Sequence, residues 1–281
     1  MRLPIVSGQF YAKDKDKLVE QIETCFKNSE FGPGKLPERE KKAIGIITPH
    51  AGYIYSGFCA AHGFTKIGQP EIAILLGTSH IDHPSEKFAV SLEDFQTPIG
   101  VAENDIELTR SLISQEHNCE QNEVIHKFEH SIETQIPFLQ YVSPKTKIVP
   151  IIVLTKDLGE IKKFSEFLVE KIKGKDIVII ASSDLTHYGT GYGFTPFLEN
   201  ERENLHKLDE SIIRPILEFN ILDFFEKASE STVCGILPII LAINTCQKLG
   251  STKAELLKYY SSGDILKDYK NTVGYACISF N

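Results

Sequence analysis

Three short apolar runs along the chain each end in a polar segment that carries a histidine. The runs cover residues 43–48, 72–76 and 177–181, and they lead to His50, to His80 and to the pair Asp184 and His187. Continuous apolar runs between turn residues are typical of strands buried on both faces of a parallel sheet. In open α/β sheets the ligand crevice lies at the carboxyl ends of such strands. We therefore expect these side chains to converge although they lie far apart in the sequence.

The remaining apolar spacing predicts an alternation of helices and strands. Helices are predicted at residues 14–27, 56–66, 104–115 with Asn104 as N-cap, 130–139, 158–172, 199–217, 222–227 and 237–249. Further strands are predicted at residues 87–92, 147–154, 254–261 and 273–280, the last two as a terminal pair. The alternation predicts one α/β domain over residues 1–281, a helix–sheet–helix sandwich with a largely parallel or mixed central sheet.

The composition of the chain argues against nucleic-acid binding and against membrane attachment. The formal net charge is −8, and the lysines and arginines are not clustered, which argues against a nucleic-acid partner. No apolar stretch is long enough to span a membrane, and residues 1–11 lack a signal-peptide core, so we expect a cytoplasmic protein without membrane attachment. The six cysteines form no CxxC pair, and a disulfide framework is not expected.

His50 and His80 are the first candidates for metal ligands or catalytic groups. Each follows a predicted strand by two to four residues, next to glycine or small polar residues that leave room for an imidazole. Taken alone, either could be a loop histidine satisfied by backbone groups. The repeated position favours a functional site. His83 lies beside Pro84 in an expected exposed turn, so we interpret it as peripheral.

Asp184, His187 and Cys234 are the next candidates. Asp184 and His187 would face the same side if the chain turned helical there, and the pair suits acid–base chemistry or orientation of a substrate. The alternative for Asp184 is an Asx-turn that caps a helix. Cys234 directly precedes a predicted helix, where a thiolate would be stabilised for metal binding or as a nucleophile. A buried inert cysteine is the alternative.

His130 and Glu133 are three residues apart, which would place them on one helical face as supports for metal ligands, or as a capping contact. The other histidines, His62, His117, His126 and His206, have no such context. The sequence contains no GxxxxGK[ST], no GxGxxG after a strand and no GxSxG. Nucleotide binding and serine hydrolase chemistry are therefore disfavoured.

These segments together resemble the Memo family, also called AmmeMemoRadiSam system protein B. They occur in the family's order over nearly the whole chain. The matching pieces are residues 8–11 (GQFY), 49–53 (PHAGY), 77–80 (GTSH), 129–133 (EHSIE), 182–184 with His187 (SSD, H) and 234–235 (CG). The family is in turn similar in fold to class III extradiol dioxygenases, which hold non-haem Fe(II) with two histidines and a carboxylate.

The resemblance implies a mononuclear metal site. Its ligands would be His50, His80 and Cys234, with Asp184 and His187 beside the open coordination positions. Cys234 stands where the dioxygenases supply a carboxylate. Thiolate is a softer ligand that accepts Fe(II) but also favours copper or zinc. Ring-cleaving dioxygenase chemistry is correspondingly disfavoured.

The leading hypothesis is a metal-dependent redox enzyme, with Fe(II) as cofactor, that acts on a small-molecule or peptide-borne substrate. His187 would be the acid–base residue, and Asp184 would orient either His187 or the substrate. One alternative is a peptide-binding or scaffold protein that retains the pocket, because eukaryotic relatives are linked to phosphotyrosine-peptide binding. Another is a protein that sequesters copper or iron. The family's name further implies a pathway shared with AMMECR-type and radical-SAM proteins.

Overall fold

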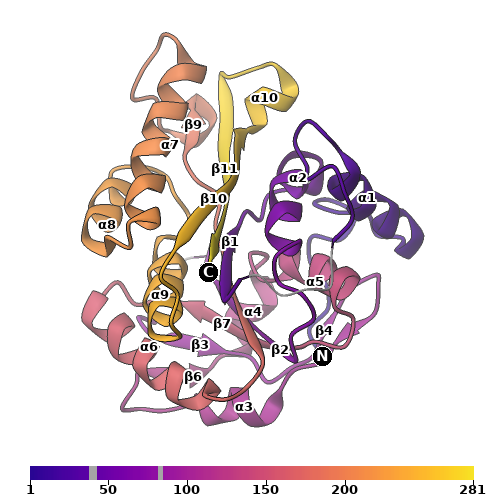
Figure 1. The fold of residues 1–281 in the computed structure, drawn as a ribbon, viewed down its shortest axis with the longest axis vertical. Coiled ribbons are helices and arrows are strands. Elements are labelled where there is room, and N and C mark those ends of the chain that lie inside the picture. The colour runs from indigo at the N-terminus through magenta and orange to yellow at the C-terminus, as the bar shows by residue number, and fades with distance from the viewer. Residues whose placement is uncertain (38–42, 82–84) are drawn as a thin grey trace.

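The computed structural model describes residues 1–37, 43–81 and 85–281. Its main feature is one mixed sheet with helices on both faces, as the sequence predicts (Figure 1). Across the sheet the order is β10 (Ala254–Ser261), β11 (Asn271–Phe280), β1 (Gly45–Thr48), β8 (Ile177–Ser182), β2 (Ile72–Gly77), β7 (Lys147–Val153), β3 (Phe88–Val90) and β6 (Cys119–Gln121), and β9 (His187–Gly189) pairs with β11.

The centre of this sheet is parallel. β1 pairs with β8, β8 with β2, and β2 with β7, all in parallel register. β11 runs antiparallel to both β1 and β10, and β3 runs antiparallel to β7. A short hairpin of β4 (Phe95–Gln96) and β5 (Val101–Ala102) lies outside the sheet. The four parallel strands therefore all end at one edge.

Alternation of side chains along each central strand explains why the strands are apolar up to their last residues. In β8, Ile177, Ile179 and Ala181 pack into the core on one face of the sheet. Val178 and Ile180 pack into a separate core on the other face. Because successive side chains point to opposite faces and both faces are covered, no position in the strand can be polar without losing its hydration.

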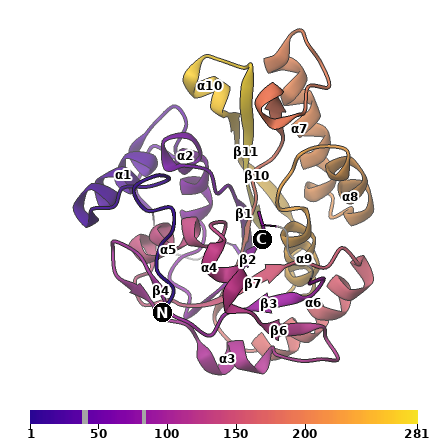
Figure 2. The same ribbon diagram turned by 180° about the vertical axis from the view of Figure 1, so that it is seen from behind.

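Two groups of helices cover these faces, and both views show β10 and β11 running between them (Figures 1 and 2). One face is covered by α3 (Ile106–Ser111), α6 (Leu158–Ile172), α7 (Glu201–Leu217), α8 (Ile221–Ser229) and α9 (Ile236–Lys248). The other is covered by α1 (Lys15–Lys27), α2 (Tyr53–Phe64), α4 (Glu123–Phe128) and α5 (Ile136–Val142). Short turns of helix complete the described chain: η1 (Glu133–Gln135), η2 (Thr190–Tyr192) and α10 (Ser262–Leu266).

Two predicted helices differ from the structure. The helix predicted at 104–115 is only α3, and its N-cap is Asp105, whose Oδ1 accepts a hydrogen bond from the Leu108 amide. The Asn104 side chain instead bonds Ser91 and Thr109, so tertiary contacts override its capping preference. The helix predicted at 130–139 begins only at Glu133.

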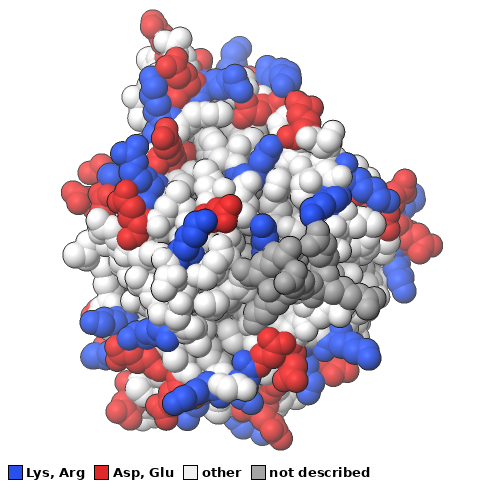
Figure 3. Space-filling model, viewed as in Figure 1, with Lys and Arg blue, Asp and Glu red and all other residues white. Residues whose placement is uncertain are grey.

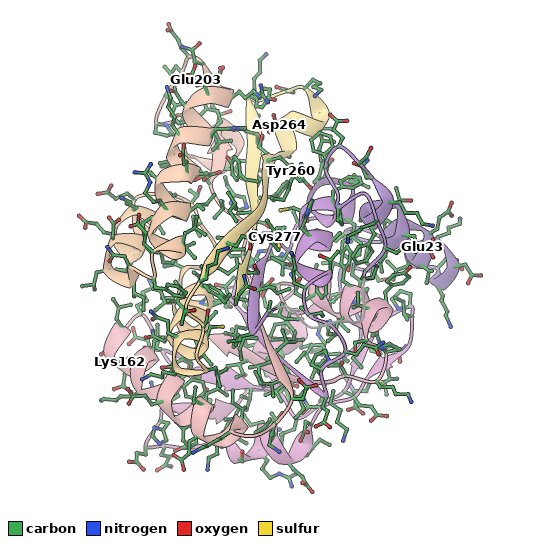
Figure 4. The ribbon with its side chains drawn as sticks, viewed as in Figure 1. Glu23, Lys162, Glu203, Tyr260, Asp264 and Cys277 are labelled. Atoms are coloured by element: carbon green, nitrogen blue, oxygen red, sulfur yellow. The ribbon has the colours of Figure 1, made fainter. Side chains whose placement is uncertain are left out.

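The C-terminal strands pair as predicted, but they are joined to the main sheet through β11. Tyr260 of β10 and Cys277 of β11 lie between these strands and α2 (Figure 4). The Tyr260 hydroxyl donates to the Tyr55 carbonyl and accepts from the Cys59 amide. The hairpin thus fixes the helix that follows the His50 segment.

The surface carries mixed charge. On the face shown in Figure 3, acidic and basic side chains are interspersed. Within the described residues, no helix has both the length and the apolar character needed to cross a membrane.

A buried ion pair fastens the N-terminal segment to the body of the protein. The Arg2 guanidinium contacts the Glu133 carboxylate, and both side chains are only 1% exposed. Glu133 also accepts hydrogen bonds from the amides of Ile5 and Val6 and from the Tyr11 hydroxyl. Arg2 donates further to backbone carbonyls, so no charge in this cluster is left without partners.

We expect Glu133→Gln to lower the free energy of unfolding by about 3–5 kcal/mol, because the buried Arg2 charge would lose its counter-charge. Urea unfolding followed by circular dichroism measures this loss. The matched control is Glu23→Gln, which breaks the exposed Lys27–Glu23 pair at the outer surface (Figure 4) and should cost less than about 0.5 kcal/mol. Equal effects of the two substitutions would contradict the assignment.

Candidate metal centre

The strand ends bring the predicted donor atoms together. His50 follows β1 and His80 follows β2, at the edge where the parallel strands end. One ligand atom each from His50, His80 and Cys234 lie within 4.8 Å of one another. The His50 Nε2 to Cys234 Sγ distance is 3.1 Å. Bonds of about 2.1 Å to nitrogen and about 2.3 Å to sulfur would separate two ligand atoms by roughly 3.6 Å in a tetrahedral site. The donor types and spacing therefore fit one metal ion.

Cys234 reaches this position because Gly235 lets the start of α9 lie directly against the end of β8. A Cβ atom at Gly235 would be 2.4 Å from the Ser183 Cβ and 2.6 Å from the Ser182 carbonyl oxygen. The Cys234 Sγ accepts a hydrogen bond from the Asp184 amide at 3.2 Å. The Cys-Gly pair thus joins the thiol to the end of the strand.

The protonation of the thiol differs from the expectation for a helix N-terminus. Burial, and next the negative charge of Asp184, raise the pKa of the Cys234 thiol well above its usual range. Burial of the sulfur therefore acts against the thiolate that a helix N-terminus would favour. A cation beside the sulfur would be needed to remove this proton at neutral pH.

The Ser182 hydroxyl orients His50. Its one proton goes to the Ser131 carbonyl at 2.6 Å. Its oxygen also lies 2.9 Å from the Gln135 Nε2, which donates to it, and 3.0 Å from the His50 Nδ1. Since the serine has no second proton, the His50 Nδ1 must donate, and its Nε2 lone pair faces Cys234. Burial, reinforced by the charge of His80, lowers the pKa of His50 to about 3, so this ring is neutral at physiological pH.

Glu129 orients His80 in a similar way. Its Oε1 lies 2.9 Å from the His80 Nδ1, and its Oε2 accepts from the His80 amide at 2.6 Å. The amides of His130 and Ser131 also donate to Oε1. Burial alone would raise the pKa of Glu129, but the hydrogen bonds and charge of His80 lower it to about 2. An ionised carboxylate on Nδ1 leaves the His80 Nε2 free as a ligand atom.

Sequence reasoning gave no role to Glu129 or Ser182, although both lie in the segments that carry the family resemblance. Glu129 is 49 residues from His80, and no local spacing links the two. The only signal available was the adjacency of Glu129 to His130, and of Ser182 to Asp184.

His130 lies beside the cluster, while Glu133 does not. The His130 ring centroid is 4.4 Å from that of His80 and 5.4 Å from that of His50, with Phe10 packed against its other side. His130 precedes the helix, so the predicted shared helical face does not exist. The Glu133 carboxylate bonds Arg2 and the N-terminal segment instead. The prediction that Glu133 supports a metal ligand is therefore wrong. Glu129, and not Glu133, contacts His80.

His187 and Asp184 approach the site from an extended segment, since the chain forms β9 there and not the helix that the prediction considered. Asp184 Oδ1 accepts a hydrogen bond from the His50 amide at 2.8 Å. The His187 Nδ1 lies 3.1 Å from the carbonyl oxygens of both Leu185 and Thr232. Two acceptors require that Nδ1 carry the proton, which leaves the His187 Nε2 free to accept one.

The segment between these two residues is held by β11 and α7. The Leu185 amide donates to the Gly274 carbonyl, and the Gly274 amide donates to the Thr186 carbonyl. From α7, the buried Asp209 accepts from the Thr186 amide and from the Tyr259 hydroxyl. A Cβ at Gly274 would be 1.9 Å from the Asp209 Oδ2, so glycine is required for this carboxylate to approach.

The remaining histidines stay outside the cluster. Within the described residues, the two groups with metal-ligand spacing are His50–His80–Cys234 and His80–Glu129–His130. The other histidines make local contacts: His62 with the Phe31 carbonyl, His117 with the Phe167 ring, His126 with the Ala89 carbonyl and His206 with Asp264. His83 lies outside the described residues.

Comparison with known proteins places the whole chain in one family. The model of the Memo-like protein family matches residues 2–279. A MEMO1 family protein of Nitrosopumilus maritimus (strain SCM1) is 34% identical over 285 residues, covering 100% of this chain and 99% of that protein. A MEMO1 family protein of Methanosarcina mazei is 36% identical over 283 residues, covering 99% of this chain and 98% of that protein.

A solved structure shares the fold alone. The crystal structure of an uncharacterized protein from Escherichia coli K12 superposes with a TM-score of 0.51 at 9% sequence identity. The match covers 85% of this chain and 100% of the other.

Titration of Asp209 predicts a pH-dependent stability. Burial raises the pKa of Asp209 from 3.8 to about 6, although Thr186, Tyr259 and the charge of His206 oppose the shift. The folded chain holds this proton more tightly than the unfolded chain, so its contribution is present below pH of about 4 and is lost as the pH rises through about 6. Relative to Asp209→Asn, the native chain should lose about 2–3 kcal/mol of unfolding free energy across that window.

Urea unfolding of both proteins at pH values from about 4 to 8 measures the difference. The difference should level off above the window. A difference that is independent of pH would refute the assigned pKa.

Proposed function

Since this chain belongs to the Memo-like protein family, we propose that it is a metal-dependent redox protein whose His50, His80 and Cys234 hold one non-haem metal ion, Fe(II) in the first instance. Its substrate would be a small molecule or a peptide-borne group. One observation carries the proposal. One donor atom each of two histidines and one cysteine converge, and a hydrogen-bond partner on each Nδ1 leaves the Nε2 of both rings available to a metal ion.

The surroundings support a metal and not a merely structural cluster. Metal-binding histidines usually donate their second ring N–H to a carboxylate or another acceptor, which fixes the tautomer and ring orientation. Glu129 does this for His80, and Ser182 does it for His50. Three protein ligands would leave coordination positions open, as catalytic sites require.

A bound Fe(II) ion would supply electron transfer with an external oxidant such as O₂. The chain's own residues would handle protons and position. The His187 Nε2, free because Nδ1 donates to backbone carbonyls, would accept a proton from substrate. Asp184 would hold the His50 segment through the His50 amide. Burial, opposed by the charge of His187, raises the pKa of this carboxyl.

A second candidate function is the holding of copper or zinc without turnover. The thiol of Cys234 is the observation that favours it, because a thiolate with two imidazoles suits these ions as well as Fe(II). Metal content distinguishes the two.

We expect protein purified anaerobically, without a metal-binding tag, to contain close to one equivalent of iron per chain. His50→Ala and Cys234→Ser should each lower the iron content per chain at least about tenfold, because each substitution leaves only two of the three protein ligands. Quantification of iron, copper and zinc per chain measures the effect. His187→Gln should retain the metal, since it removes the proposed proton acceptor and no ligand.

The matched controls are His117→Ala and Cys119→Ser, which remove the same residue types outside the donor groups. Both should keep the native metal content. Copper or zinc in place of iron would support the second candidate. Unchanged metal in both ligand variants, or no metal after reconstitution, would refute the proposed site.

A further inference from the structure

A pocket of ≈ 510 Å³ adjoins the thiol side of the donor cluster, with Cys234 in its wall. It is formed where β2 and β7 end, by residues such as Thr78 and Leu154, and by the facing parts of α8 and α9. Small-molecule sites typically have volumes of about 300–1,000 Å³ and lie at this edge of α/β sheets. The pocket therefore has the volume and the position that are typical of a substrate site.

Apolar side chains form about half of the pocket wall, and most of the other lining residues carry hydroxyl groups. Val153 and Leu154 line it from the sheet side, and Phe225 of α8 with Ile236 and Leu237 of α9 line it from the helix side. The Phe225, Ile236 and Leu237 side chains are half-buried, so part of their surface faces the opening. An aromatic ring or a short aliphatic chain would remove this surface from water.

One charge stands out in this pocket. Among its lining residues, as far as the structure describes the chain, Lys156 alone is charged, and no carboxylate accompanies it. The Lys156 side chain is exposed. The neighbouring Asp157 carboxylate accepts hydrogen bonds from the Gly159 and Glu160 amides at the start of α6. Because the described lining residues place a cation in the wall and include no carboxylate, this part of the pocket favours an anionic ligand.

We propose that this pocket binds a small organic carboxylate with an aromatic or aliphatic body. The body lies against Phe225 and Ile236, the carboxylate pairs with Lys156, and the remaining face of the ligand lies toward Cys234. As an assignment of substrate class, this rests on the proposed metal function. As an assignment of binding, it stands on the pocket alone.

Calorimetric titration of the full-length protein with 3-phenylpropanoate and with its neutral isostere 3-phenylpropanamide tests the proposal. We expect the acid to bind about fivefold more tightly than the amide, which corresponds to about 1 kcal/mol for one exposed ion pair. Lys156→Met should reduce acid binding to the level of the amide and leave amide binding unchanged. Phe225→Ala should weaken both ligands.

The matched control is Lys175→Met, which removes an amine from a different pocket, at the amino-terminal ends of the strands. We expect this variant to bind both ligands as tightly as the native chain does. Equal binding of acid and amide, native acid binding by Lys156→Met, or no binding of the acid would each overturn the proposal.

Titration of metal-free and Fe(II)-loaded protein separates this proposal from the metal centre. Lys156-dependent binding by a chain that takes up no metal would leave the pocket assigned and refute the metal function. Metal uptake through His50, His80 and Cys234 without Lys156-dependent binding would refute only the pocket.

Discussion

The hydroxyl of Ser182 has a single proton, and the arrangement of the donor cluster depends on where that proton goes. It is committed to the Ser131 carbonyl, so Gln135 and His50 must both donate to the oxygen. This fixes the tautomer of His50 and points its free nitrogen at Cys234. The same three bonds join the end of β8, the turn at Ser131 and the segment after β1. The geometry of the site and the packing of these segments are therefore one network, and neither can change alone.

Two buried glutamates, four residues apart in the sequence, bind different parts of the structure through their carboxylates. Glu133 neutralises Arg2 and fastens the N-terminal segment, which places Phe10 against His130. Glu129 faces the other way and holds His80. Both carboxylates are surrounded by hydrogen-bond donors, which offset the free-energy cost of burying their charges. The turn between them can therefore lie over the strand ends with both carboxylates buried.

The sequence predicted the central strands and most helices because their apolar patterns are set by burial on both faces. The helix at 158–172 and the terminal strand pair illustrate this. It also predicted that His50, His80 and Cys234 meet, through strand ends and family resemblance. It missed Glu129 and the extended path of Asp184 to His187, since each depends on contacts between distant segments. The spacing of three between His130 and Glu133 was misleading because no helix spans both residues.

Charge balance explains why a cysteine can stand in this site beside an aspartate. His50 is neutral and burial keeps the Cys234 thiol protonated, so these two side chains add no charge to that of the neighbouring Glu129 and Asp184 carboxylates. A divalent ion would bring two positive charges to the same place. Loss of the thiol proton would supply one negative charge, and the carboxylate of Asp184, the residue whose backbone amide donates to the sulfur, a second. The Cys234 thiolate and the Asp184 carboxylate would then both lie near the ion, in addition to Glu129 on His80, while Asp184 still accepts from the amide of His50.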